Sequence, residues 1–191
     1  MLALWPVFTS LHGPTSVNEE GTLFGGSALF WGSMMEGPSL LLIALGLAGS
    51  YERLTGQASR AARVGFVLVI VALVVPALIN IAIRAVIPPL LAPVLGAGLV
   101  LMAVGNRASS LPTFSRAVLV AMGMLQFFAF LWALLVRPDV LDRIDGYRIY
   151  GVGASVLFGL GWILLGASLM TRRREQKRAS PPQRQSEPAP L

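Results

Sequence analysis

Five long apolar stretches dominate this sequence and constrain its fold more than any other feature. They cover residues 23–48, 64–86, 89–104, 117–136 and 150–170. A helix that crosses a lipid bilayer needs about 20 mostly apolar residues, and each stretch reaches or approaches that length. Only 13% of the residues are charged, whereas soluble domains carry roughly a quarter. We therefore expect an all-α integral membrane protein, a bundle of five transmembrane helices across residues 23–170.

The stretch 89–104 is the shortest, and Pro88, Pro89 and Pro93 crowd its start. Proline is tolerated in the first turn of a helix because those N–H groups have no intrahelical partner. The second and third helices are therefore expected to form a tight hairpin that turns around residues 87–89. The alternative is four full crossings with a re-entrant hairpin.

The distribution of basic residues predicts the orientation of the bundle. Eleven Lys and Arg residues fall in the two loops and the tail on one side, and four fall in the loops on the other side. Cytoplasmic loops carry the excess of basic residues. The N-terminus is thus expected outside the cell and the C-terminus inside.

The two ends of the chain are expected to lie outside the bilayer. Residues 1–22 form an extracytoplasmic leader, which is too short in its apolar part for a signal peptide and is broken by Pro6. Its Trp5 and Phe8 suit the outer membrane interface. Residues 171–191 form a disordered cytoplasmic tail, rich in Pro, Ser and Gln in its last part. Five basic residues at its start are predicted to contact anionic lipid headgroups: Arg172, Arg173, Arg174, Lys177 and Arg178.

The composition also excludes several classes of function. The net charge is +6, but the basic residues flank apolar stretches and are not interleaved with aromatic residues, so no nucleic-acid partner is expected. Cysteine is absent, which excludes thiolate chemistry. His12 is the only histidine, and the three Asp residues of the loop 137–148 alternate with Arg. No metal site, cofactor or enzymatic activity is predicted, because no catalytic or phosphate-binding motif is present. The preference for Arg over Lys is typical of a GC-rich bacterial genome, and the expected location is the cell membrane.

Small residues indicate where helices pack. Gly151, Ser155 and Gly159 recur every four residues in the fifth stretch and so share one helical face. Helices in lipid associate through close backbone approach at such faces. The face is expected to contact another helix of the chain or of a second copy.

Glu36 is the only ionisable residue of the first apolar stretch. A carboxyl group within a membrane helix is costly and therefore a functional candidate. Ala28, Gly32 and Glu36 share one stripe, which predicts that Glu36 faces the bundle interior and not lipid. Pro38 removes a backbone hydrogen bond, so a local kink is expected beside the carboxyl group.

The other polar candidates inside the apolar stretches are Asn80, Arg84 and Gln126. Asn80 and Arg84 are four residues apart and share a helix face. We hypothesise a buried ion pair between Glu36 and Arg84, bridged by Asn80 or water. In the alternative, Arg84 extends to the outer headgroups. Glu36 is then expected to be protonated at neutral pH, because desolvation disfavours its charged form.

Two functions follow from these patterns. The first is a non-catalytic accessory, assembly or scaffold protein that acts through helix–helix contacts. The alternative is a small proton-coupled transporter or exporter that uses Glu36. In placing one acidic residue in its first helix, the chain is similar to small multidrug-resistance exporters, although those are shorter four-helix chains and their surrounding motif is missing here.

Overall fold

Helices are the regular secondary structure of the described part of the chain. The computed structural model describes residues 28–55, 58–84, 90–106, 111–135 and 156–171, and no strand occurs among them. The predicted all-α fold is thus confirmed for these residues. The helices are α2 (Ala28–Ala48), α3 (Tyr51–Thr55), α4 (Arg60–Ile83), α5 (Ala92–Gly105), α6 (Thr113–Leu135) and a final helix, Val156–Thr171.

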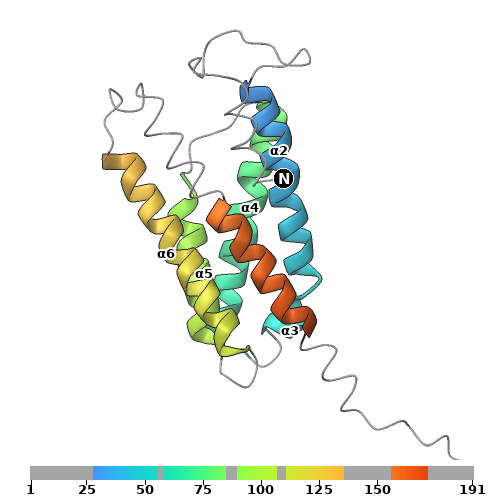
Figure 1. Ribbon diagram of the computed structural model, residues 1–191, viewed down its shortest axis with the longest axis vertical. Helices are drawn as coiled ribbons and strands as arrows, with labels where there is room; N and C mark the ends of the chain where they lie inside the picture. Colours follow the sequence, from blue (N-terminus) through green and yellow to red (C-terminus); the bar gives the residue numbers. More distant parts are fainter. Residues whose placement is uncertain (1–27, 56–57, 85–89, 107–110, 136–155, 172–191) are drawn as a thin grey trace, which may run out of the picture.

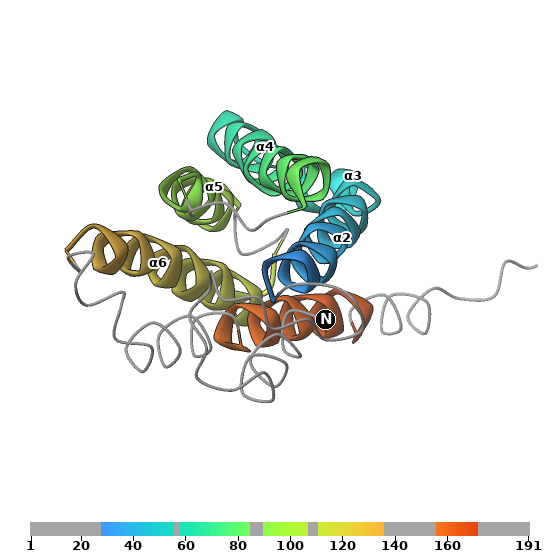
Figure 2. The ribbon, with the colours of Figure 1, turned by 90° about the horizontal axis from the view of Figure 1, so that it is seen from above.

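The long helices form a bundle in which chain neighbours pack against each other. α4 contacts α2 on one side and α5 on the other, and α5 also contacts α6. The helix Val156–Thr171, unlabelled and orange in Figures 1 and 2, lies alongside α6 and next to α2. Viewed from above, these helices surround a common core (Figure 2).

Local capping explains why α4 begins four residues before the predicted stretch. The hydroxyl of Ser59 accepts a hydrogen bond from the backbone N–H of Ala62 at 3.4 Å, which satisfies one of the free donors of the first turn. At the other end the helix stops at Ile83, and Arg84 follows in the left-handed conformation with φ 53°. Residues 85 and 86 of the predicted stretch lie outside the described residues.

Prolines define the starts of α5 and α6. Pro93 occupies the first turn of α5, as predicted, and the helix then runs to Gly105. α6 begins at Thr113, four residues earlier than predicted, because Pro112 precedes the helix and its carbonyl accepts a hydrogen bond from the N–H of Arg116 at 3.1 Å. The predicted turn at residues 87–89 lies outside the described residues.

Glycine pairs set the spacing between α4, α5 and α6. A Cβ atom placed on Gly65 would lie 2.6 Å from the carbonyl oxygen of Gly98, and one placed on Gly98 would lie 2.8 Å from that of Gly65. Gly96 and Gly123 form the same kind of contact between α5 and α6, with 2.7 Å in both directions. The three helices therefore touch through their backbones, as small residues permit in membrane proteins.

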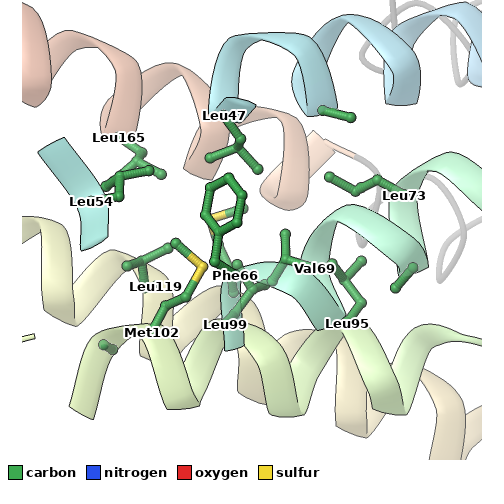
Figure 3. Close-up of a cluster of buried hydrophobic side chains, with 14 of the residues drawn as sticks. Leu47, Leu54, Phe66, Val69, Leu73, Leu95, Leu99, Met102, Leu119 and Leu165 are labelled. Carbon is green, nitrogen blue, oxygen red and sulfur yellow. The ribbon is translucent and has the colours of Figure 1, made fainter. Parts of the chain in front are cut away.

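Apolar side chains from every described helix converge between the helices. Figure 3 shows this core around Phe66, with Leu47 and Leu54 on one side and Leu99 and Met102 on the other. The ring of Tyr51 meets that of Phe66 edge-on at 5.0 Å. This contact ties the short α3 to the start of α4.

Within the described residues, two helices are long and apolar enough to cross a membrane by length and composition, Phe30–Ala48 and Arg60–Ile83. The other apolar helical segments are shorter: Ala92–Gly105, Thr113–Phe128 and Val156–Thr171. Length and composition alone therefore support two of the five expected spans.

Candidate functional site

The polar group at the centre of the candidate site is the half-buried carboxyl group of Glu36 on α2. The amide of Asn80 on α4 donates a hydrogen bond from Nδ2 to Glu36 Oε2 at 3.4 Å. Asn80 is only 1% exposed. The site is thus a carboxyl–amide pair that joins α2 to α4. Its two residues are 44 positions apart in sequence.

Gly37 lets α2 approach α4 at this level. A Cβ atom placed on Gly37 would lie 2.7 Å from Cγ1 of Ile81 and 3.1 Å from the carbonyl oxygen of Ala77. Both contact residues flank Asn80 in sequence. The glycine that precedes Pro38 therefore permits the close approach on which the Glu36–Asn80 contact depends.

A proline lies close to each member of the pair. Pro38 follows Glu36 in α2, and Pro76 lies one helical turn before Asn80 in α4. Each proline lacks a backbone N–H, which leaves the carbonyl four residues earlier without its helical donor. Both helices continue past their proline.

The register between α2 and α4 decides the depth of the pair. Glu36 lies near the middle of α2, but Asn80 is only three residues from Ile83, the last residue of α4. At 1.5 Å per residue this is about 4.5 Å from the helix end. The pair is therefore close to the end of α4 and far from its middle. The position of Glu36 near the middle of its own apolar stretch did not indicate this level along α4.

The predicted ion pair between Glu36 and Arg84 is not formed. Arg84 is exposed at the C-terminal end of α4, and no ion pair joins these two described residues. The left-handed backbone at Arg84 ends the helical face that it was expected to share with Asn80. The hydrogen bond from Asn80, a neutral donor, is the polar contact of the carboxyl group.

Gln126 is not brought to the pair. It is half-buried on α6, where its Cβ would lie 3.6 Å from a Cβ atom placed on Gly96 of α5. No hydrogen bond joins it to Glu36 among the described residues. Of the predicted polar candidates, only Glu36 and Asn80 meet.

The predicted packing residues are partly visible. Gly32 is buried and Gly159 is half-buried, and the backbone of Ala28 is helical. Gly151 and Ser155, the basic residues 172–178, the leader and the loop 137–148 lie outside the described residues. In the final helix Gly161 packs against α6, where a Cβ atom would lie 2.5 Å from Sδ and 2.6 Å from Cγ of Met122.

A second polar cluster, which the sequence did not reveal, surrounds the end of α5. The side chain of Asn106 donates to the carbonyl of Met102 at 2.8 Å, and Nε of Arg116 donates to the carbonyl of Ala103 at 3.0 Å. The backbone N–H of Ser59 donates to the carbonyl of Gly105 at 3.1 Å. These donors satisfy carbonyls that a helix end leaves free. The nearby glycine and asparagine were the available sequence signals for a helix end here.

The final helix joins this end of the bundle through a serine pair. The hydroxyls of Ser115 on α6 and Ser168 lie 2.7 Å apart, and Ser168 also donates to the carbonyl of Leu165 at 2.9 Å. Ser115 is fully buried. The pair fixes the position of the final helix along α6.

Within the described residues no group of three or more His, Cys, Asp or Glu residues is placed to hold a metal ion. His12 and the Asp residues of the loop 137–148 are outside this part of the chain. Comparisons with protein-family profiles, curated proteins and solved structures find no match to this chain.

Proposed function

We propose that this chain is a five-span integral protein of the bacterial cell membrane, with its N-terminus outside and its C-terminus inside. The outward face of α4 carries the main support. Large apolar side chains are exposed along it at intervals of three or four residues: Val64, Val67, Val71, Val75 and Leu78. A soluble monomer rarely exposes so continuous an apolar surface, whereas lipid covers it without cost.

The opposite face of α4 completes this pattern. Its buried positions include Ala62, Gly65 and Ala72, which are small. The same face also buries the larger Phe66, Val69 and Leu73, so α4 presents small residues where Gly65 meets α5 and large residues to the core. Close approach at small residues is expected of helices that pack in lipid.

The antiparallel course of α5 supports a crossing over a re-entrant hairpin. α5 is 14 residues long, about 21 Å at 1.5 Å per residue. Its last residue, Gly105, accepts a hydrogen bond from Ser59, immediately before the start of α4. A re-entrant segment would instead return to the side on which α4 ends.

We further propose that the protein is a non-catalytic accessory, assembly or scaffold protein that acts through helix–helix contacts. The support is that the described polar side chains mostly bond to backbone carbonyls of the helices. The hydroxyls of Ser33, Ser39 and Thr55 each donate to a carbonyl of their own helix. Asn106 and Arg116 cap α5. These groups satisfy helix carbonyls, and Arg116 also joins α6 to α5; none of them forms a reactive constellation.

Membrane fractionation and reporter fusions test the membrane part of the proposal. The protein should resist extraction by alkaline carbonate and dissolve in detergent. Fusions at Gln57 and at the C-terminus should report the inside. Recovery in the soluble fraction, or an outside signal at Gln57, would contradict it.

One observation favours proton-coupled transport as a second candidate. Glu36 has no cationic partner among the described residues, and its Oε1 has no hydrogen-bond partner. Oε1 is not among the buried unpartnered polar atoms, so it reaches the surface. A carboxyl group in this state can exchange protons, which coupled transport requires.

Glu36→Gln separates the two candidates, with Glu52→Gln, at an exposed position of α3, as the matched control. Loss of proton flux into proteoliposomes by folded Glu36→Gln, with flux kept in Glu52→Gln, supports transport. Loss of stability or assembly in Glu36→Gln supports a structural carboxyl group. Absence of flux in the unaltered protein would exclude the transport candidate.

A further inference from the structure

The Glu36–Asn80 pair lies at very different distances from the two ends of α4. Asn80 comes four residues before Arg84 and 17 residues after Arg63, and both arginines are exposed. At 1.5 Å per residue these separations are about 6 Å and about 25 Å. Their sum, about 31 Å, matches the hydrocarbon thickness of a bilayer. In the proposed membrane location the two arginines therefore lie at opposite surfaces, and the pair lies close to the surface at Arg84.

An aromatic pair on α2 gives the same depth. The rings of Phe30 and Trp31 meet edge-on at 5.3 Å, and both residues are half-buried. Tryptophan is enriched where a membrane meets water. Trp31 precedes Glu36 by five residues, which is about 7.5 Å of helix. Two helices thus independently place Glu36 near the same membrane surface.

Toward the opposite surface the pair is followed by a closely packed apolar core. Residues 40–48 of α2 and 64–79 of α4 carry no polar side chain. Their core positions are at most 8% exposed: Leu40, Ala44, Leu47, Phe66, Val69, Ala72, Leu73 and Ala77. A buried water needs several polar partners. This core therefore offers water no path to the carboxyl group.

Polar side chains from the other helices do not bridge this distance. The Nε1 atom of Trp162 has no hydrogen-bond partner, and the side chain of Gln126 has none in the described structure. Ser115 and Ser168 bond to each other, at the end of the bundle away from the pair. Within the described residues, no chain of hydrogen bonds runs from Glu36 to the Arg63 side.

The carboxyl group itself keeps one oxygen available. Asn80 donates to Oε2 at 3.4 Å, whereas Oε1 has no hydrogen-bond partner and is not among the buried unpartnered atoms. Arg84, the nearest charged residue along α4, does not pair with it. α2 and the final helix carry no other ionisable residue. Oε1 is therefore free to give or take a proton.

We propose that Glu36 exchanges its proton with the aqueous phase on the Arg84 side of the membrane and is closed to the phase on the Arg63 side. In the proposed orientation the Arg84 side is outside the cell. The inference rests on the membrane location proposed above, and it applies to a scaffold protein as well as to a transporter. For a transporter, it makes this structure the state that loads protons from outside.

Cysteine accessibility tests this one-sided exposure, because the chain contains no cysteine and Glu36→Cys then carries the only thiol. The full-length variant is treated in right-side-out and in inside-out membrane vesicles with a charged, membrane-impermeant methanethiosulfonate. The thiolate attacks the reagent's sulfenyl sulfur, so that a mixed disulfide forms and methanesulfinate leaves. Mass spectrometry measures the labelled fraction. We expect labelling to be at least about tenfold faster from the Arg84 side, since thiol reactivity follows exposure.

Three further variants are the matched controls. Arg84→Cys and Arg63→Cys, at exposed positions near opposite ends of α4, report which side of each vesicle the reagent reaches. Ala44→Cys lies two turns further along α2, where the side chain is 4% exposed. It should react from neither side.

The unaltered protein carries the test if Glu36→Cys does not fold. A charged, membrane-impermeant carbodiimide with an added primary amine then replaces the thiol reagent. The carboxyl O–H adds across one C=N bond of the carbodiimide, and the amine displaces the resulting urea to leave an amide on Glu36. Modification should again come from the Arg84 side.

Several outcomes would overturn the proposal. They are labelling at position 36 from the Arg63 side, equal labelling from both sides, reaction with a lipid-soluble reagent only, and no reaction with any reagent. Absence of the protein from the membrane fraction, or labelling of Arg84→Cys and Arg63→Cys from the same side, refutes the proposed membrane crossing instead. Labelling of Arg84→Cys from the inside reverses the orientation and leaves the one-sided exposure to be read from position 36.

Discussion

Asn80 on α4 donates a hydrogen bond to the carboxyl group of Glu36 on α2 at 3.4 Å. The donor is a buried neutral amide, and Arg84, one helical turn further on, is exposed and unpaired. The acidic residue of the first apolar stretch is therefore tied to the bundle by an amide and not by an ion pair.

A double-mutant cycle should measure this contact. We expect a coupling free energy of about 0.5–1.5 kcal/mol between Glu36→Leu and Asn80→Leu, the range found for hydrogen bonds between membrane helices. Unfolding by dodecyl sulfate in mixed micelles gives the four free energies. Additive single effects would contradict a direct Glu36–Asn80 bond.

The glycine contact between α4 and α5 should not tolerate a methyl group. Gly65→Ala places its Cβ 2.6 Å from the carbonyl oxygen of Gly98, so the helices must separate, at a cost of about 1–3 kcal/mol in unfolding free energy. Gly46→Ala is the matched control, because no atom lies within 4 Å of its added Cβ. It should be neutral or stabilising by up to about 1 kcal/mol. Equal effects of the two changes would argue against the backbone contact.

The serine pair provides a test of how the final helix packs. The chain contains no cysteine, so Ser115→Cys/Ser168→Cys introduces the only two thiols. Because the hydroxyl oxygens lie 2.7 Å apart, we expect rapid disulfide formation under mild oxidation. Free thiols are counted by maleimide labelling. Ser115→Cys/Ala167→Cys should stay largely reduced, since Ala167 is exposed, and equal oxidation of both pairs would contradict the packing.

Trp162 carries the one buried side-chain nitrogen or oxygen without a hydrogen-bond partner in the described part of the chain, its Nε1. Trp162→Phe removes that unsatisfied donor and keeps a ring beside Phe158, whose centroid lies 5.6 Å away. We expect a change in unfolding free energy below about 1 kcal/mol, against about 3–5 kcal/mol for Trp162→Ala. Thermal unfolding in detergent measures both. A large loss in Trp162→Phe would mean that the indole N–H has a partner that matters for stability.

Local pattern was enough to predict the helices of this chain and roughly where they lie. Apolar stretches and prolines are properties of neighbouring residues, so α4, α5 and α6 begin within four residues of the predicted stretches. Ser59 and Pro112 account for the earlier starts of α4 and α6 through short-range bonds.

The partner of Glu36 was decided by tertiary structure, because it depends on how far α2 slides along α4. That register is set where Gly37 meets Ile81 and Ala77, a contact between segments about 40 residues apart. Sequence periodicity predicts which face of a helix a side chain occupies, but not how far along the neighbouring helix it lies. The register between α2 and α4 places Asn80, and not Arg84, beside the carboxyl group.

The glycines that matter most were also chosen by the fold. The spacing of small residues directed attention to the first and fifth stretches, yet Gly65, Gly98 and Gly123 make the backbone contacts, each from a stretch without a regular glycine repeat. The sequence by itself determined which segments become helices and that a single carboxyl group lies within the first of them. Only the tertiary structure decided which glycines touch, where Arg116 points and what Glu36 binds, because these depend on contacts between distant helices that no local pattern encodes.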